Sequence, residues 1–428
     1  MILDRKKAPE RTAAASTPPL NTNPIEFAGG LNCYTVEGGT EEIIKIDLVF
    51  KAGTRFEKKP LVSSICSNTL KEGTALFSSE EIAETVDFYG AQIATGLSKD
   101  RAEVTLLCQN KHLDKLVDIF TDVFMAPTFP ENEIDQYKKR SRSKLAVNLD
   151  KVEFKCRLLF SELMFPNSAY RELYDLSYYD SISRADLEDF FSAHFDLAEA
   201  YCVISGKNTA QAAQILEESI AKKRKDFGQA TKYNADANWN YSQGEKWIEK
   251  AGAVQTAIRM GAPALNRNHI DYPALYLANV ALGGYFGSRL MQNIREEKGY
   301  TYGIGSGINV LEQASYLSIS TQVGAEFTRA TIDEIKKELH TISTQNLAVD
   351  ELELIQHYIA GNLLKRFDGP FSTSDRLKAV LNNGLGADWY TNFSKAIFDL
   401  DADQVRKVAG TYLNPELFTI AVSGKWEE

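Results

Sequence analysis

The sequence lacks the features that mark several large protein classes. None of its apolar runs approaches the ~18–20 residues of a membrane-spanning helix. Cations are outnumbered, with 48 Lys and Arg against 58 Asp and Glu, so the formal net charge is -10. This balance argues against a nucleic-acid or anionic-membrane surface, which would need clustered Lys and Arg. With 428 residues, the chain is expected to be a soluble globular protein of at least two domains.

Cysteine and histidine are both scarce. The five cysteines are odd in number, widely spaced and mostly inside apolar runs, which is typical of reduced, buried thiols. No apolar segment near the N-terminus marks a signal peptide, so we expect a cytoplasmic protein, with the periplasm as the alternative. The five histidines are scattered, and no two of them lie three or four residues apart. They therefore offer no pair of metal ligands on one helical face.

Two stretches far apart in the chain are similar to each other. Residues 182–207 and 400–425 have equal length, share apolar positions and end in an apolar strand followed by Ser-Gly-Lys. In both halves, a strand, two helices and a strand pair precede this stretch, which indicates a duplication. The predicted segments are a polar N-terminal arm (1–24), a first domain (25–221), a polar and aperiodic linker (222–247) and a second domain (248–428). We therefore predict an α+β fold of two homologous domains, each an antiparallel-rich sheet packed against helices.

Local signals support this division. Apolar residues alternate with polar ones in residues 43–50, which predicts a half-buried strand. Ser78 and Glu81 have the spacing of a capping box and predict a helix over residues 79–89, ended by Gly90. Residues 254–263 are expected to form the corresponding first strand of the second half.

Several motifs of this frame belong together. The chain contains AGTRFEK, then a helix closing on EGT, then SSEEIAETVDFYGA, and later GGYFGSRLMQNIREEKGYTYGIGS. From about residue 25 onward it resembles the insulinase/pitrilysin family of zinc metallopeptidases. In that family the first helix carries the motif H-x-x-E-H shortly before a Gly-Thr pair. Its imidazoles bind Zn²⁺ from one helical face while the carboxylate takes a proton from the bound water. The resemblance implies that this chain forms half of a clamshell.

The metal-binding positions of that motif are altered here. Counting back from the Gly-Thr pair, the resemblance places them at Ser64, Ser67 and Asn68. Neutral oxygen donors match Zn²⁺ poorly, and none of these side chains is a general base near neutral pH. The family's third ligand should fall within residues 140–150, where the sequence is cationic instead. We therefore expect no metal and no cofactor in this chain. The three residues fit the polar face of an amphipathic helix, or a polar patch that touches a peptide or a partner.

A second family motif is retained. Arg295 lies near the end of a predicted helix, and Tyr302 follows seven residues later in a predicted strand. The resemblance matches them to an Arg and a Tyr that approach substrate carbonyl oxygens and stabilise the developing oxyanion. Residue chemistry alone leaves alternatives. Arg295 could pair with Glu296 or Glu297, and Tyr300 lies on the same strand face as Tyr302, so either tyrosine could contact the substrate.

The resemblance implies a non-catalytic subunit of a heterodimeric peptidase. A homologous partner would carry H-x-x-E-H and the zinc ion, and this chain would supply Arg295 and Tyr302. The substrate would be a peptide or unfolded polypeptide, and metalloendopeptidase activity would require the partner. Two other hypotheses remain, a structural or scaffolding protein and a homodimeric peptide-binding module.

Overall fold

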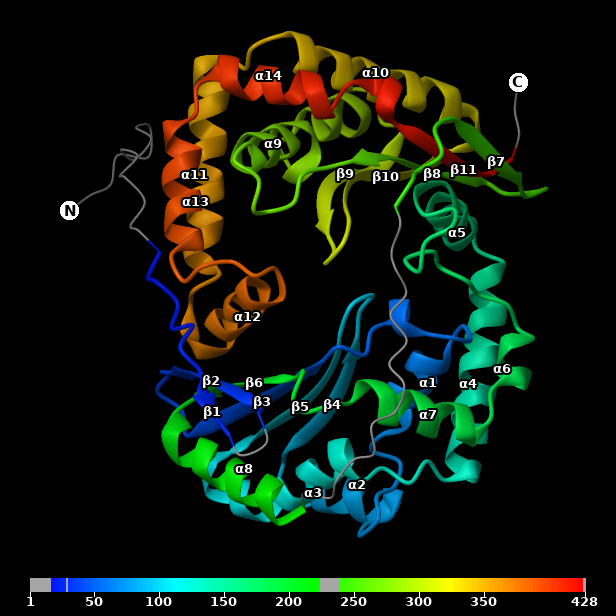
Figure 1. The fold of residues 1–428 in the computed structure, drawn as a ribbon. Helices are drawn as coiled ribbons and strands as arrows, with labels where there is room; N and C mark the ends of the chain where they lie inside the picture. The colour runs from blue at the N-terminus through cyan, green and yellow to red at the C-terminus, as the bar shows by residue number, and fades with distance from the viewer. Residues whose placement is uncertain (1–16, 28–29, 224–238, 426–428) are drawn as a thin grey trace, which may run out of the picture.

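The computed structural model describes residues 17–27, 30–223 and 239–425. Within these residues the chain forms two β-sheets with helices packed on both of them (Figure 1). The first sheet has the strand order β1-β2-β6-β3-β5-β4, and the second has the order β7-β11-β8-β10-β9. The predicted α+β fold, with one antiparallel-rich sheet in each half, is confirmed.

Apart from β1, the two sheets are built in the same way. The strands of the first are β1 (Ile25–Glu26), β2 (Asn32–Glu37), β3 (Ile43–Phe50), β4 (Gln92–Leu97), β5 (Ala102–Gln109) and β6 (Tyr201–Gly206). Those of the second are β7 (Glu245–Glu249), β8 (Gln255–Pro263), β9 (Thr301–Val310), β10 (Ser315–Gly324) and β11 (Thr419–Gly424). In each sheet the closing strand, β6 or β11, lies parallel to the first long strand and antiparallel to the next. The repeat read from the sequence therefore corresponds to equivalent strands of the fold.

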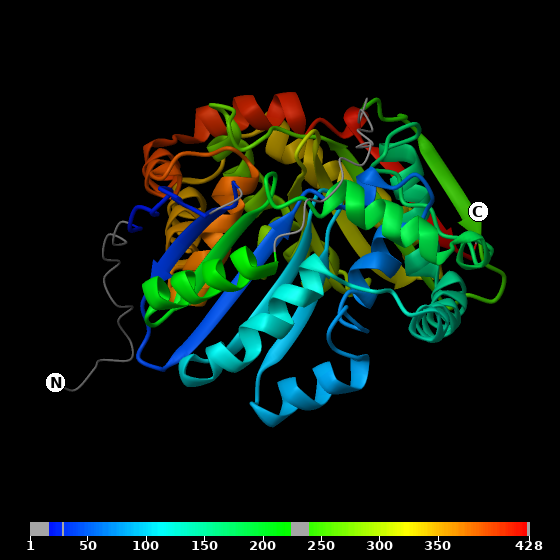
Figure 2. The ribbon, with the colours of Figure 1, turned by 60° about the horizontal axis from the view of Figure 1, so that its bottom comes forward.

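Both halves of the chain contain several helices. The first half contributes α1 (Val62–Thr69), α2 (Ser79–Phe88), α3 (Leu113–Met125), α4 (Glu131–Leu149), α5 (Val152–Met164), α6 (Tyr178–Ser181), α7 (Arg184–His194) and α8 (Thr209–Lys223). The second contributes α9 (Tyr272–Asn279), α10 (Thr328–Thr344), α11 (Val349–Lys365), α12 (Gly369–Asn382), α13 (Trp389–Asp399), α14 (Ala402–Tyr412) and two π-helical turns, η3 (Val280–Gly284) and η4 (Met291–Glu297). Figure 2 brings the first half forward and shows α3 and α8 side by side on its sheet. In the described ranges, no helix is both long and apolar enough to cross a membrane.

Two helices cross from one half to the other. Helix α5 belongs to the first half of the sequence but packs against β8 and β11 of the second sheet (Figure 1). Cys156 on this helix donates a hydrogen bond to the Ala421 carbonyl, with 3.2 Å between Sγ and O. A Cβ atom at Gly261 would lie 2.5 Å from the Phe160 ring, so only glycine allows the helix to approach this closely. Conversely, α12 of the second half packs against β2 and β6 of the first sheet.

Polar contacts also join the halves. Lys378 on α12 lies 3.0 Å from the carboxylate of Asp47, whose side chain is fully buried in β3. Arg55 of the first half lies 2.7 Å from Glu312, in the turn between β9 and β10. The Tyr201 hydroxyl donates to Asn382 Oδ1 across 2.8 Å. The halves are therefore joined by buried apolar, ionic and hydrogen-bonded contacts.

The structure describes parts of the predicted terminal arm and of the predicted linker. Leu20 is buried and donates its backbone N–H to the Ala387 carbonyl, so the described end of the arm packs on the second half. An apolar side chain thus anchors the described end of the predicted arm. Within the predicted linker, residues 222–223 complete α8 and β7 begins at residue 245. Residues 1–16 and 224–238 lie outside the described part of the chain. The domain boundaries themselves stay a prediction.

Candidate functional site

Helix α1 holds the positions at which the family motif would bind metal. Its N-terminus is fixed by the carboxylate of Glu57, which accepts hydrogen bonds from the backbone N–H groups of Leu61 (2.9 Å) and Ser63 (3.3 Å) and from the Ser63 hydroxyl. The first N–H groups of a helix have no hydrogen-bond partner within the helix. Here the Glu57 carboxylate accepts from them, as the side chain of an N-cap residue would. Leu61 has a φ of 74°, a left-handed conformation that is unfavourable for a leucine. The Glu57 bonds help to offset this strain.

The three motif positions lie in different surroundings. Ser64 is half-buried, and its hydroxyl lies 3.4 Å from the hydroxyl of Tyr137 on α4. Ser67 is only 1% exposed, which differs from the polar face predicted for it. The reason is that α1 is enclosed between α4, α7 and β4, so more than one side of the helix is buried. Asn68 is half-buried and donates its side-chain amide to the Ser64 carbonyl across 2.8 Å.

These residues do not fit a zinc ion. Their donors are neutral oxygens, one of them is buried in the packing, and the Asn68 amide is already bound to the helix backbone. No group of three or more His, Cys, Asp or Glu in the described ranges is placed to hold a metal. The cations of the predicted ligand window, Arg140, Arg142 and Lys144, are exposed on α4.

The residue of α4 that contacts Ser64 is therefore Tyr137, which the sequence reasoning missed. It lies outside the predicted window of residues 140–150. Ile134 and Leu145 are the buried residues of this otherwise polar helix, and Tyr137 lies on the same side. The spacing of these apolar residues is the signal that could have identified it.

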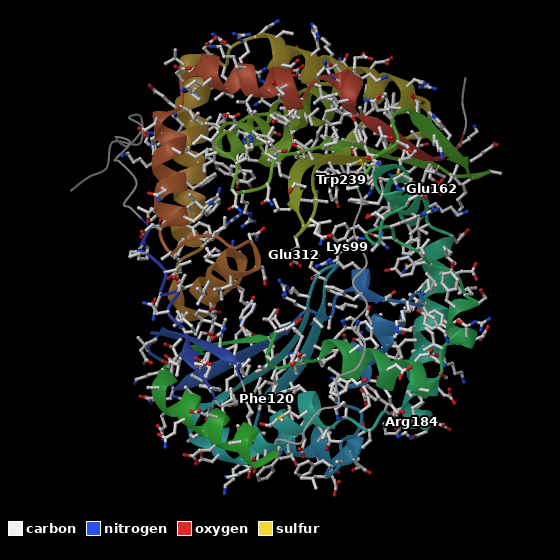
Figure 3. All side chains as sticks on the ribbon, in the orientation of Figure 1. Lys99, Phe120, Glu162, Arg184, Trp239 and Glu312 are labelled. Atoms are coloured by element: carbon white, nitrogen blue, oxygen red, sulfur yellow. The ribbon has the colours of Figure 1, made fainter. Side chains whose placement is uncertain are left out.

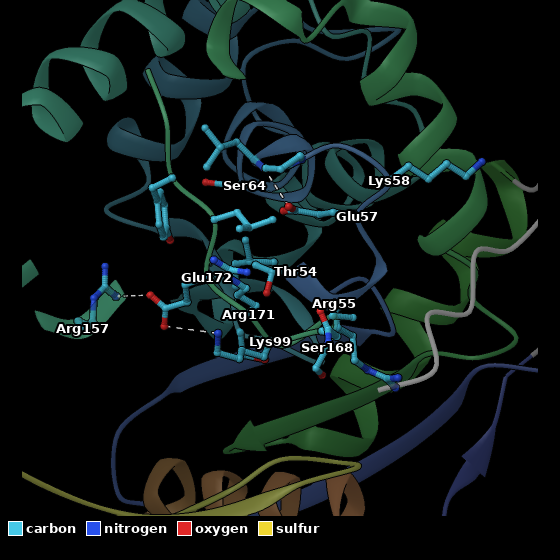
Figure 4. Close-up of a pocket in the computed structure, with 18 residues that line it drawn as sticks. Thr54, Arg55, Glu57, Lys58, Ser64, Lys99, Arg157, Ser168, Arg171 and Glu172 are labelled. Carbon is cyan, nitrogen blue, oxygen red and sulfur yellow. Dashed lines mark hydrogen bonds and ion pairs between the residues drawn. The ribbon is translucent and has the colours of Figure 1, made fainter. Parts of the chain in front are cut away.

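A cavity of about 720 Å³ opens beside Ser64. Figure 4 shows the carboxylate of Glu172, which lines this cavity, lying between two cations. One carboxylate oxygen is 3.4 Å from Lys99 Nζ and the other is 3.2 Å from Arg157 on α5. Lys99 also donates to the Tyr170 carbonyl across 2.8 Å. Burial lowers the pKa of Lys99, and the nearby Glu172 carboxylate opposes that effect.

Arg295 and Tyr302 lie in the other half. Arg295 lies in the last turn of η4, where its guanidinium is 2.8 Å from Glu296 and stacks over the Phe286 ring at 4.8 Å. The pairing with Glu296 is the structural alternative that the sequence left open. Tyr302 on β9 is 94% exposed, whereas Tyr300 stacks on Phe327 with ring centroids 4.5 Å apart. Of the two tyrosines, only Tyr302 therefore has its ring free to meet a ligand.

The structure does not bring the two motifs into one site within this chain. Tyr302 lines a separate cavity of about 370 Å³, bordered by β8, β9, β10 and Glu153 of α5. Arg157, one helical turn further along α5, lines the cavity beside Ser64. Helix α5 thus separates the altered metal positions from Tyr302. The β9 strand that carries Tyr302 is also the edge of its sheet.

Comparisons with known proteins agree on one family. Residues 35–171 match the family model described as "Insulinase (Peptidase family M16)", and residues 181–359 match "Peptidase M16 inactive domain". Among curated proteins, the "Uncharacterized zinc protease YmxG" of Bacillus subtilis is 23% identical over 399 residues, 91% of this chain and 94% of the relative. The "Non-peptidase homolog YmxG" of Helicobacter pylori is 21% identical over 351 residues, which cover 79% of this chain and 78% of the relative.

Solved structures show the same fold. The peptidase M16 inactive domain from Pseudomonas fluorescens aligns with a TM-score of 0.86 and 22% identity, covering 95% of this chain and 99% of the other. A protease from Helicobacter pylori aligns with a TM-score of 0.86 and 15% identity, covering 95% and 100%. At these identities the likeness speaks for the fold.

Proposed function

Because the chain belongs to the insulinase (M16) peptidase family, we propose that it is a non-catalytic subunit that lends Arg295 and Tyr302 to a homologous, zinc-bearing partner. The observation that carries this proposal is the contrast between the two motifs. The α1 positions do not fit a metal, whereas Tyr302 remains almost fully exposed beside the packed Tyr300. The exposed phenol of Tyr302 is accessible to another molecule, and this accessibility supports the proposed contact with a substrate.

In the proposed complex, this chain contributes electrostatics. The phenol of Tyr302 would donate a hydrogen bond to a substrate carbonyl oxygen as that oxygen gains negative charge. The Arg295 guanidinium would place a positive charge near the same oxygen. Its present partner, Glu296, is more than half exposed, and ion pairs of this kind contribute only about 0–1 kcal/mol. Arg295 can therefore exchange this carboxylate for a substrate at small cost. The partner would supply the metal and the activated water.

The proposal is tested by reconstitution. The purified chain alone should hydrolyse no peptide, and activity should appear when an H-x-x-E-H homologue from the same source is added. In the complex, Tyr302→Phe should lower kcat by roughly 10²–10³-fold, as expected for loss of an oxyanion donor, without changing assembly by size-exclusion chromatography. Tyr300→Phe is the matched control, because it removes a hydroxyl from the same strand and keeps the ring on Phe327.

Three results would contradict the proposal. Peptide hydrolysis by the isolated chain would mean that it is itself catalytic. If the complexes containing Tyr302→Phe and Tyr300→Phe had equal kcat, the Tyr302 hydroxyl would have no specific role in catalysis. A stable complex whose activity does not depend on this chain would favour the scaffolding hypothesis.

A further inference from the structure

We propose that the cavity beside Ser64 is a binding site for the carboxylate group of a peptide. This inference relies on the proposed function only for the peptide nature of the ligand. The site consists of residues on the β4–β5 turn, the segment before α1, helix α5 and the segment after it. Figure 3 shows Lys99 from this site between the two halves of the chain, near Glu312.

The charge of the cavity is opposite to that of the chain. The chain has a formal net charge of -10. Yet the cavity is lined by the cations Arg55, Lys58, Lys99, Arg157 and Arg171 and only two carboxylates, Glu57 and Glu172. Such a local concentration of positive charge, in a recess with low-dielectric walls, attracts anions.

Not all of these charges are available. Arg55 pairs with Asp100 and Glu312, and Arg171 pairs with Glu162. These two arginines are therefore neutralised by three carboxylates, none of which lines the cavity.

The remaining cations exceed the remaining carboxylates. Glu57 directs its carboxylate to the start of α1, where backbone N–H groups and a hydroxyl occupy it. Glu172 is shared between Lys99 and Arg157. Lys58 also lines the cavity, is exposed, and forms no ion pair with any residue the structure describes. Lys58, Lys99 and Arg157 thus contribute three positive charges to the lining against the one shared carboxylate of Glu172, and an incoming carboxylate would restore the balance.

The size and lining of the cavity fit part of a peptide. Its volume of about 720 Å³ lies within the range of about 300–1,000 Å³ that is typical of small-ligand sites. Hydroxyl groups of Thr54, Ser64 and Ser168 can donate to a carboxylate, and Leu97 and Leu173 offer apolar surface to a side chain beside it. Ser64, a position where the family motif would bind metal, would here act as a ligand-binding hydroxyl.

The test measures peptide binding to the purified chain alone, so its outcome is independent of any partner. Three fluorescein-labelled peptides of one neutral sequence are compared by anisotropy: one with a free C-terminal carboxylate, one with a C-terminal amide, and one amidated but containing an internal Asp. We expect roughly tenfold tighter binding for a carboxylate-bearing peptide than for the neutral amide. Preference for the first identifies a C-terminal carboxylate, and preference for the third an acidic side chain. Equal binding of all three, or no binding up to millimolar peptide, would overturn the proposal.

Variants locate the binding. Lys58→Gln removes an exposed cation of the lining, and Arg157→Gln removes the cation on α5. Each should weaken binding of the carboxylate peptide about five- to tenfold. Arg184→Gln is the control, because it makes the same charge change at an exposed site on α7 outside the cavity. If the control weakens binding as much as Lys58→Gln, the attraction is non-specific and the proposal fails. Unfolding midpoints in urea show that each variant is folded.

Discussion

Replacing Glu57 by Gln should change how the stability of the protein depends on pH. The carboxylate lies at the start of α1, and burial raises its pKa from the ordinary 4.5 to about 7. Hydrogen bonds from Ser63 and Leu61 and the charge of Lys99 act in the opposite direction but do not offset the burial. Glu57 is thus an acid that the folded state keeps protonated at a higher pH than the unfolded chain does.

The sign and size of the effect follow from proton linkage. Between pH 4.5 and about 7, the folded state binds more protons at this site than the unfolded state. The contribution of Glu57 to the free energy of unfolding therefore falls as the pH rises through this window. A difference of about 2.5 between the two pKa values corresponds to about 3 kcal/mol. Glu57 is half-buried, so solvent screening reduces this contribution to the free energy of unfolding. We therefore expect about 2 kcal/mol.

Glutamine keeps the shape of the side chain and an oxygen acceptor for α1 but does not titrate. Glu57→Gln and the natural protein should therefore be similar in stability at pH 5, and the variant should be the more stable by about 2 kcal/mol at pH 8. The assay is urea unfolding, followed by tryptophan fluorescence at several pH values. Glu80→Gln is the control, since Glu80 is exposed in the first turn of α2. This control should not reproduce the change expected for Glu57→Gln, because the Glu80 side chain is not buried.

The reasoning would be refuted by either of two results. A difference between the natural protein and Glu57→Gln that changes by less than about 0.5 kcal/mol from pH 5 to pH 8 would mean that burial does not dominate the pKa. A variant that becomes less stable relative to the natural protein as the pH rises would mean that Glu57 stabilises α1 mainly as an anion.

Further predictions concern packing and the buried charges. Tyr300→Ala should lower the free energy of unfolding by about 2 kcal/mol through loss of its stacking on Phe327, and Tyr302→Ala should change it by less than about 0.5 kcal/mol; equal effects in urea titrations would contradict this. Asp47→Asn should cost about 2 kcal/mol, because Lys378 loses its fully buried counter-ion but keeps Glu103 and Asp375, and a loss below about 0.5 kcal/mol in the same titration would argue against it. The five cysteines are all buried and free, and burial raises the thiol pKa at four of them. At pH 8 the native protein should incorporate almost no iodoacetamide by mass spectrometry, in contrast to the protein in urea, and rapid native labelling would contradict the buried placement.

Features set by neighbouring residues could be predicted from the sequence. The capping box is one example. The Ser78 side chain accepts a hydrogen bond from the backbone N–H of Glu81, and the Glu81 side chain accepts one from the backbone N–H of Ser78. The repeat is another. It predicts equivalent closing strands because two apolar strands of similar sequence require similar burial, and β6 and β11 are both buried and occupy equivalent positions.

Features set by distant residues could not be predicted in this way. The apolar side of α5 is visible in the sequence, but periodicity does not say which sheet covers it. The close approach of Phe160 to Gly261 shows that the second sheet covers α5, and this contact joins residues from different halves of the chain. Ser67 gives a similar lesson. Its polarity suggested an exposed face, but the packing of α4, α7 and β4 around α1 buries it.

The crossing of α5 also bears on how the proposed carboxylate site would work. Lys99 lies in the turn between β4 and β5 of the first sheet, whereas Arg157 lies on α5, which packs against the second sheet. Glu172 joins the two cations, and the Arg55–Glu312 ion pair lies across the same boundary. A movement of one half relative to the other would therefore change the distance between Lys99 and Arg157. Since the attraction of a carboxylate to two cations falls as they separate, a bound peptide would favour the arrangement in which the halves are held together.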